Sequence, residues 1–158
     1  MTNTEIMQRE NTLMQQDIES SRRLRMIHRS SGTYVVVEDD ESVGDLLSVI
    51  IKTRGRSVAV FSGVKAASDF VESAGAENVS CCIIDLNLGR DNGESFVDWL
   101  EYNHKDVPVL VYTADEQRGS DVKTKYPWIN VLFKNGHHQI KSLMDAIGLR
   151  DGPVLLTG

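Results

Sequence analysis

In the stretch Tyr34-Val35-Val36-Val37-Glu38-Asp39-Asp40, an apolar run typical of a buried strand ends in three consecutive carboxylates. Four more runs rich in β-branched and apolar residues follow, beginning near Ser57, Cys81, Val107 and Asn130. Such residues favour strands, and the runs recur about every 24 residues, a spacing typical of strands that alternate with helices. The sequence therefore predicts five repeats of a strand followed by a helix.

The connections between these runs support that prediction. Apolar residues recur at helical spacing in the first and last connections, at Val43, Leu46, Leu47, Ile50 and Ile51 and at Ile140, Leu143, Met144 and Ile147. Alternating strands and helices form a parallel sheet covered on both faces. We predict a doubly wound, flavodoxin-like (βα)5 domain and take the strand order 2-1-3-4-5, one of the two common orders. The fourth connection, residues 115–127, is polar and contains Gly119, so a short, mobile helix is expected there.

This domain is expected to span residues 33–149. Residues 1–32 form a helical extension that ends at the break Ser30-Ser31-Gly32, and residues 150–158 form a C-terminal tail. The apolar positions of the extension fit a heptad only in part, so a coiled coil remains an open alternative. We expect the extension to act in self-association or in docking, and a homodimer is possible.

Composition and charge exclude several classes of protein. The 158 residues suit one domain, and no apolar run approaches the ~20 residues that span a membrane. The net charge of −6 divides into +1 for residues 1–32 and −7 for the rest, which makes nucleic acid an unlikely partner. No secretory signal pattern opens the chain, so a cytoplasmic location is expected. Cys81 and Cys82 are neighbours in one strand and are expected to be buried thiols on opposite faces.

Acidic residues follow two of the predicted strands. In a doubly wound sheet, ligands bind beyond the carboxyl ends of the strands. With the strand order above, Glu38 and Asp39 lie beside Asp85. Two such charges ~4 Å apart repel by about 4 kcal/mol at an effective dielectric near 20, so the cluster needs a cation. Mg²⁺ suits these oxygens and usually binds one or two carboxylates together with phosphate oxygens, which suggests a phosphoryl group.

Two further residues at strand ends suit a phosphoryl group. Thr113 and Lys134 end the fourth and fifth runs, and neighbouring strands lie ~4.8 Å apart. A hydroxyl and an ammonium at these places supply a hydrogen-bond donor and a cation for phosphoryl oxygens. Asp85 is the carboxylate between both groups, so it is the expected nucleophile for an aspartyl phosphate.

The runs VVVEDD, CIIDLNL, VLVYTA and LFK, in that order, resemble the receiver domain of two-component response regulators. The resemblance implies that Asp85 accepts a phosphoryl group from a histidine kinase or a histidine phosphotransfer protein. It also implies the direct Mg²⁺ ligands Asp39, Asp85 and the backbone carbonyl of Asn87, a water-mediated ligand Glu38, phosphoryl contacts from Thr113 and Lys134, and access past the small Ala114. A protein of this family is no enzyme beyond its own phosphorylation and dephosphorylation, and it signals by binding an output protein, here unknown.

The sequence departs from the family pattern at three places. Gly89 and Asn135 each stand where a proline is usual, and Val131 replaces a common aromatic residue that partners Thr113. These departures leave an alternative open, a pseudo-receiver that binds partners without phosphorylation. A haloacid-type phosphatase is disfavoured because the motif at Asp85 lacks a second aspartate two residues on and lies in the third strand, and no P-loop motif occurs.

Overall fold

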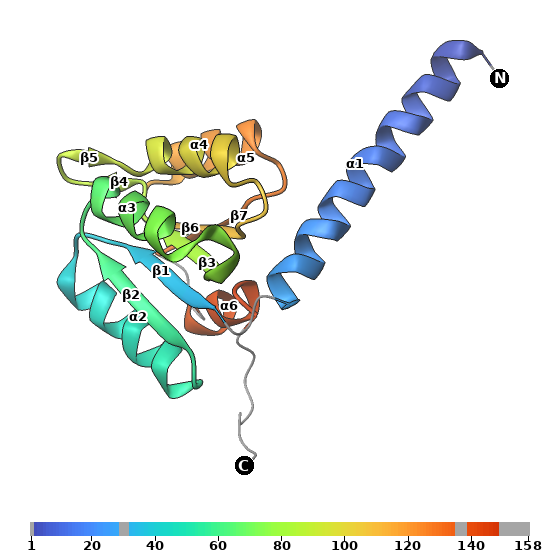
Figure 1. The fold of residues 1–158 in the computed structure, drawn as a ribbon. Coiled ribbons are helices and arrows are strands. Elements are labelled where there is room, and N and C mark those ends of the chain that lie inside the picture. The colour runs from blue at the N-terminus through green and yellow to red at the C-terminus, as the bar shows by residue number, and fades with distance from the viewer. Residues whose placement is uncertain (1, 29–31, 135–138, 149–158) are drawn as a thin grey trace.

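The computed structural model describes residues 2–28, 32–134 and 139–148 (Figure 1). Seven strands occur within these ranges: β1 Thr33–Val37, β2 Ser57–Phe61, β3 Val79–Ile84, β4 Asn87–Leu88, β5 Asp91–Asn92, β6 Val109–Thr113 and β7 Asn130–Phe133. The helices are α1 Asn3–His28, before the first strand, α2 Glu41–Thr53, α3 Val64–Ala74, the short 3-10 helix η1 Ala76–Asn78, α4 Gly93–Asn103, α5 Glu116–Lys125 and, after the last strand, α6 Gln139–Ala146.

Five strands form one parallel sheet in the order β2-β1-β3-β6-β7. This is the predicted order 2-1-3-4-5, so the flavodoxin-like fold class is confirmed. The fourth predicted strand is β6, and it begins at Val109, two residues later than the apolar run suggested. Pro108 lacks an N–H donor and does not extend the ladder in that direction, although its carbonyl accepts a hydrogen bond from the Cys82 amide at 2.9 Å.

The sheet lies between α3, α4 and α5 on one side and α2 and α6 on the other (Figure 1), and it separates two apolar layers. Side chains of α3, α4 and α5 pack on one face, and side chains of α2 and α6 pack on the other. Residues of one strand alternate between the layers, because successive side chains point to opposite faces. Cys82 lies in the first layer and Cys81 in the second, and both are buried and not part of a disulfide. Burial raises the pKa of Cys81 to about 12, so this thiol is unreactive in the folded protein.

Three helices begin at an Asx residue whose side chain accepts amide hydrogen bonds from the first turn. The N-caps are Asp40 for α2, Asn92 for α4 and Asp115 for α5. Helix α3 differs from these three, because its N-cap residue is Gly63, which has no side chain to accept such a hydrogen bond. Instead the Asp91 carboxylate accepts a hydrogen bond from the Val64 amide at 2.9 Å. The small sheet of β4 and β5 is therefore attached to the start of α3.

Helix α5 packs closely on β7 through a glycine. A Cβ at Gly119 would lie 2.6 Å from the Phe133 ring and 3.1 Å from Val131. The fourth connection is thus a helix of ten residues with a close contact to the sheet, nearly as long as α3 and α4. The mobility predicted for it stays a prediction. The aromatic residue beside α5 is Phe133, whose Cα pairs with that of Thr113.

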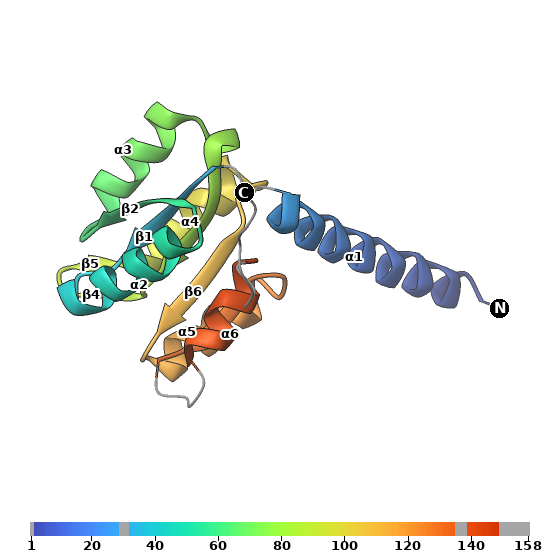
Figure 2. The ribbon, with the colours of Figure 1, turned by 90° about the horizontal axis from the view of Figure 1, so that it is seen from below.

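The predicted N-terminal extension is the long helix α1, which projects away from the sheet in Figures 1 and 2. Its described side chains, residues 3–16, are all exposed. No helix among the described residues is both long enough and apolar enough to cross a lipid bilayer. The predicted domain boundaries at residues 30–32 and 149–150 fall largely on positions that are not described, so they stay predictions.

Candidate functional site

Three carboxylates meet at the carboxyl end of the sheet. Glu38 directly follows β1 and donates its amide to the Phe61 carbonyl at 2.9 Å, while the Asp85 amide bonds the Val37 carbonyl at 3.0 Å. These backbone bonds extend the ladders of β1 by one residue, and they hold the acidic side chains side by side. One oxygen each of Glu38, Asp39 and Asp85 lies within 4.8 Å of the others. The predicted acidic cluster is present.

Lys134 neutralises part of this cluster. Its Nζ lies 2.9 Å from both carboxylate oxygens of Glu38 and 2.9 Å from Oδ2 of Asp85. The Lys134 amide also donates to the Thr113 carbonyl at 2.9 Å, which fixes the lysine backbone beside β6. Because Glu38 and Asp85 are both buried, the ammonium compensates charges that water solvates only in part.

The pKa values of the two buried carboxyl groups, Glu38 and Asp85, are shifted in opposite directions. Burial raises the pKa of Glu38 to about 7; the Lys134 ammonium lowers it, and the negative charge of Asp85 adds to the rise. Burial also raises the pKa of Asp85, but hydrogen bonds from Lys134 and from the Asn87 amide outweigh it, so this pKa is lowered. Asp85 is therefore ionised at neutral pH, as a nucleophile must be.

The remaining predicted residues lie on the neighbouring strand. Thr113 ends β6 and is fully buried, and its Oγ1 accepts a hydrogen bond from the Asp115 amide at 3.2 Å. Ala114 follows it and is exposed. β6 lies between β3 and β7, so the threonine is placed between the strands that end in Asp85 and Lys134. Asn135, one of the departures from the family pattern, lies outside the described residues.

A small hairpin that the sequence analysis did not predict follows Asp85. Asn87 in β4 pairs with Asn92 in β5, and the Asn87 amide donates to Oδ1 of Asp85 at 3.1 Å. The turn contains Gly89 at a φ of +65°, and a Cβ there would lie 3.2 Å from Oδ2 of Asp39. Proline fixes φ near −65° and does not fit this turn. The glycine therefore has a geometric reason, and it also signals a turn in the sequence.

The donor set fits a hard divalent cation. Two buried carboxylates and one exposed carboxylate converge, and the Asn87 backbone lies beside them. Mg²⁺ prefers such oxygen ligands and keeps several waters, which the exposed side of Asp39 allows. An acidic pocket that could hold a metal ion is therefore present.

Comparisons with known proteins agree with this geometry. A family model for the response regulator receiver domain matches residues 34–146. Over 89 residues the chain is 30% identical to the transcriptional regulatory protein QseB of Haemophilus influenzae, and the match covers 56% of this chain but only 39% of that protein. The chain therefore spans less than half the length of this curated relative.

Solved structures with low sequence identity share the fold. The Vibrio cholerae chemotaxis protein CheY4 superposes with a TM-score of 0.61 at 18% identity, covering 73% of this chain and 98% of that one. The BeF3-activated receiver domain of Klebsiella pneumoniae RstA gives a TM-score of 0.61 at 18% identity, covering 76% and 100%. With the family model matching most of the sequence, this chain belongs to the response regulator receiver domain family.

Proposed function

We propose that this receiver accepts a phosphoryl group on Asp85 from a histidine kinase or a histidine phosphotransfer protein and signals by binding an output protein. The observation that supports the proposal most directly is the Lys134 ammonium, 2.9 Å from an oxygen of an ionised Asp85. A phosphoacceptor site needs an ionised carboxylate beside a cation, and Asp85 and Lys134 supply both. The pseudo-receiver is therefore the less favoured function.

The reaction we propose is a transfer between a nitrogen and an oxygen. A carboxylate oxygen of Asp85 attacks the phosphorus of a phosphohistidine; the new O–P bond forms as the N–P bond breaks, and the imidazole leaves with that electron pair and takes up a proton from water. Lys134 and the Thr113 hydroxyl bind the phosphoryl oxygens, and the exposed Ala114 leaves room for the donor.

Metal ligands in this proposal come from the acidic pocket. Asp39, Asp85 and the Asn87 backbone carbonyl would hold Mg²⁺ directly, and Glu38 would hold it through water. When bound, the ion supplies positive charge to the phosphoryl oxygens in the transition state. Glu38 has a pKa of about 7, so it can give up its proton near neutral pH when a cation approaches.

Phosphoryl uptake tests this function. We expect the wild-type chain to gain the mass of one phosphoryl group when incubated with acetyl phosphate and Mg²⁺, measured by intact-protein mass spectrometry. Asp85→Asn should gain none, because the amide is not a nucleophile. Asp69→Asn is the matched control, since its carboxylate is exposed on α3 and pairs only with Lys65 among the contacts described. Equal uptake by the Asp85 variant, or none by the wild type, would contradict the proposal.

We also propose that α1 mediates self-association, with residues 33–149 as the receiver and 150–158 as a tail. Four large apolar side chains of α1 are exposed, in two pairs seven residues apart: Ile6, Met7, Leu13 and Met14. A seven-residue repeat places such pairs on one side of a helix, where a second helix can cover them.

Sedimentation or light scattering tests this role. We expect the full chain to be larger than a monomer, and a chain that begins at Thr33 to be a monomer. Ile6→Glu with Leu13→Glu should also give a monomer. Gln8→Glu with Gln15→Glu adds the same charge at the same spacing on another side of the helix and should leave the mass unchanged. The same number of chains per particle in all four proteins would rule out self-association through α1.

A further inference from the structure

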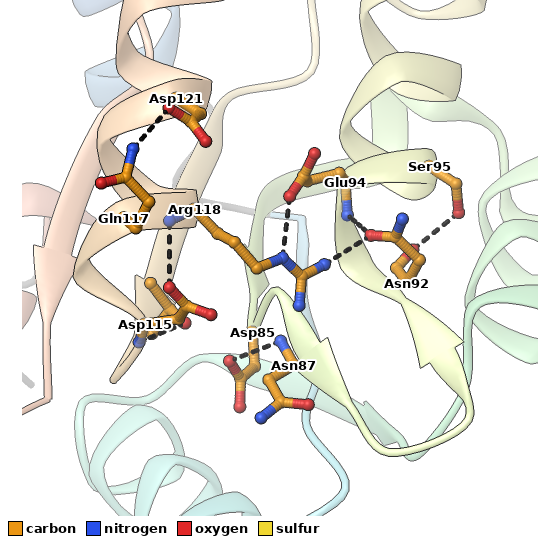
Figure 3. Close-up of polar contacts among 10 residues, drawn as sticks. Asp85, Asn87, Asn92, Glu94, Ser95, Asp115, Gln117, Arg118 and Asp121 are labelled. Carbon is orange, nitrogen blue, oxygen red and sulfur yellow. Dashed lines mark hydrogen bonds and ion pairs between the residues drawn. The ribbon is translucent and has the colours of Figure 1, made fainter.

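Arg118, in the first turn of α5, reaches across the candidate site to the base of the hairpin (Figure 3). Its Nη2 donates to Oδ1 of Asn92 at 2.7 Å, and its Nε donates to Oε1 of Glu94 at 2.9 Å. The planar guanidinium binds the two acceptors through separate nitrogens in a fixed geometry, which a lysine ammonium does not provide. Helix α5 is thereby joined to the end of β5 and the start of α4.

Asn92 connects this contact to the acidic pocket. It is the partner of Asn87 in the hairpin, and its side chain also caps α4 by accepting from the Glu94 amide at 2.9 Å. Asn87 in turn donates its amide to Asp85 at 3.1 Å. A shift of Asn92 therefore moves the backbone of Asn87, because the two residues are paired in a ladder of only two residue pairs.

The backbone of Arg118 is connected to the opposite side of the site. Its amide donates to Oδ1 of Asp115 at 3.0 Å, and the Asp115 amide donates to Oγ1 of Thr113 at 3.2 Å. One residue thus links the hairpin beside Asp85 to the threonine at the end of β6. Figure 3 shows Arg118 between Asp115 and Asn92.

We propose that Arg118 is a positioning residue for the metal site: by holding Asn92 it fixes the backbone of Asn87, the proposed carbonyl ligand, against Asp85. The inference rests on the proposed function, because it assumes that Mg²⁺ binds there. Arg118 contacts none of the proposed ligands in the contacts described; it acts on Asn87 through the Asn92 pair.

The sign of one measurement separates positioning from simple electrostatics. Arg118→Gln removes a positive charge from the surroundings of an acidic pocket and leaves Glu94 unpaired. Electrostatics alone would then strengthen the binding of a divalent cation. Loss of positioning would weaken it, since partners that orient metal ligands typically contribute roughly 10–100-fold in metal affinity. Arg118 acts on the ligand Asn87 only through Asn92, and its side chain is partly exposed. We therefore expect the Mg²⁺ affinity of Arg118→Gln to be about five-fold weaker.

Isothermal titration of the full chain with Mg²⁺ tests the proposal. Arg118→Gln should bind about five-fold more weakly than the wild type, and Arg118→Lys should fall between them because it retains one of the two contacts. The matched control is Lys125→Gln. Lys125 also joins α5 to α4, through Asp98 at 2.9 Å, but at the far end of the helix. It should bind Mg²⁺ as the wild type does.

Amide exchange in the metal-free chain gives a second, independent measurement. The Gly93 amide donates to the Leu86 carbonyl at 3.2 Å and closes the hairpin base. Its exchange should be faster in Arg118→Gln and unchanged in Lys125→Gln. Unchanged or tighter Mg²⁺ binding in Arg118→Gln, or an equal loss in Lys125→Gln, would overturn the inference. A wild-type chain that binds no Mg²⁺ would instead overturn the proposed function, together with the role assigned to Arg118.

Discussion

Lys134→Met should reduce the rate of phosphoryl uptake from acetyl phosphate roughly 100-fold, the usual cost of removing one donor that stabilises developing charge. Methionine keeps an apolar stem of similar length but lacks the ammonium that lies 2.9 Å from Asp85 and from Glu38. The same change leaves two buried carboxylates without a cation and should lower the free energy of unfolding by about 3 kcal/mol near neutral pH. Rates from intact mass over time and unfolding in urea measure both effects.

The Mg²⁺ affinity of this variant should also depend on pH. Lys134 lowers the pKa of Glu38, which is nevertheless raised from 4.5 to about 7, so loss of the lysine raises that pKa further. A protonated carboxyl group does not bind a cation. The ratio of wild-type to variant affinity should therefore be larger at about pH 6.5 than at about pH 8.5. A ratio that does not change with pH would contradict the assigned titration.

Lys65→Met is the matched control for both measurements. Lys65 also contacts an aspartate, Asp69, at 3.0 Å, but both side chains are largely exposed. An exposed pair on a helix contributes about 0.5 kcal/mol or less. We expect Lys65→Met to take up the phosphoryl group at the wild-type rate. The ratio of its Mg²⁺ affinity to that of the wild type should not depend on pH. If both lysine variants behaved alike, the contact of Lys134 with two buried carboxylates would not be the reason for its effect.

Gly93→Ala should lower the free energy of unfolding by about 3 kcal/mol or more, although alanine is normally the better helix former. A Cβ at this position would collide with the Asp85 carbonyl oxygen and lie 2.8 Å from the Leu86 Cα. Both neighbours are backbone atoms, so either α4 or the end of β3 has to move. Since the second movement displaces Asp85, phosphoryl uptake should fall as well.

Gly44→Ala makes the same chemical change inside α2 but should not lower the free energy of unfolding. Its Cβ would meet only the Cγ1 of Val60, at 3.1 Å, and because Val60 is 42% exposed its side chain has room to shift slightly. The gain in helix propensity, about 1 kcal/mol at most, should leave this variant as stable as the wild type or slightly more stable. Urea unfolding of both variants checks the pair. Equal destabilisation would show that the contact at Gly93 is not the cause.

Sequence patterns predicted the sheet because they report on burial. The apolar run from Tyr34 to Val37 is buried on both sides, as strands of a covered parallel sheet must be. Acidic residues directly after such runs meet in space, because parallel strands all end at one edge. Glu38, Asp39 and Asp85 were therefore found together from the chain alone. Lys134 contacts Glu38 as well as Asp85, and its contact with Glu38 was not predicted. The chemical roles of these residues remain predictions.

Local pairing and contacts between helices were not accessible in the same way. The hairpin of β4 and β5 has only two residues in each strand, too few for an alternating pattern, and its one sequence signal is Gly89. The contact of Arg118 with Asn92 joins residues 26 positions apart. An arginine on a polar helix looks like a surface residue in the sequence, because its partner is set by how two helices pack.

Labelling of the two adjacent cysteines can report the separation of each helix layer from the sheet. Cys81 and Cys82 lie one residue apart in the chain, yet one is covered by α2 and α6 and the other by α3, α4 and α5. A thiol reagent can reach each sulfur only when its own helix layer separates from the sheet. Single-cysteine versions of the chain would therefore time the opening of each layer separately, using probes that the native strand already contains.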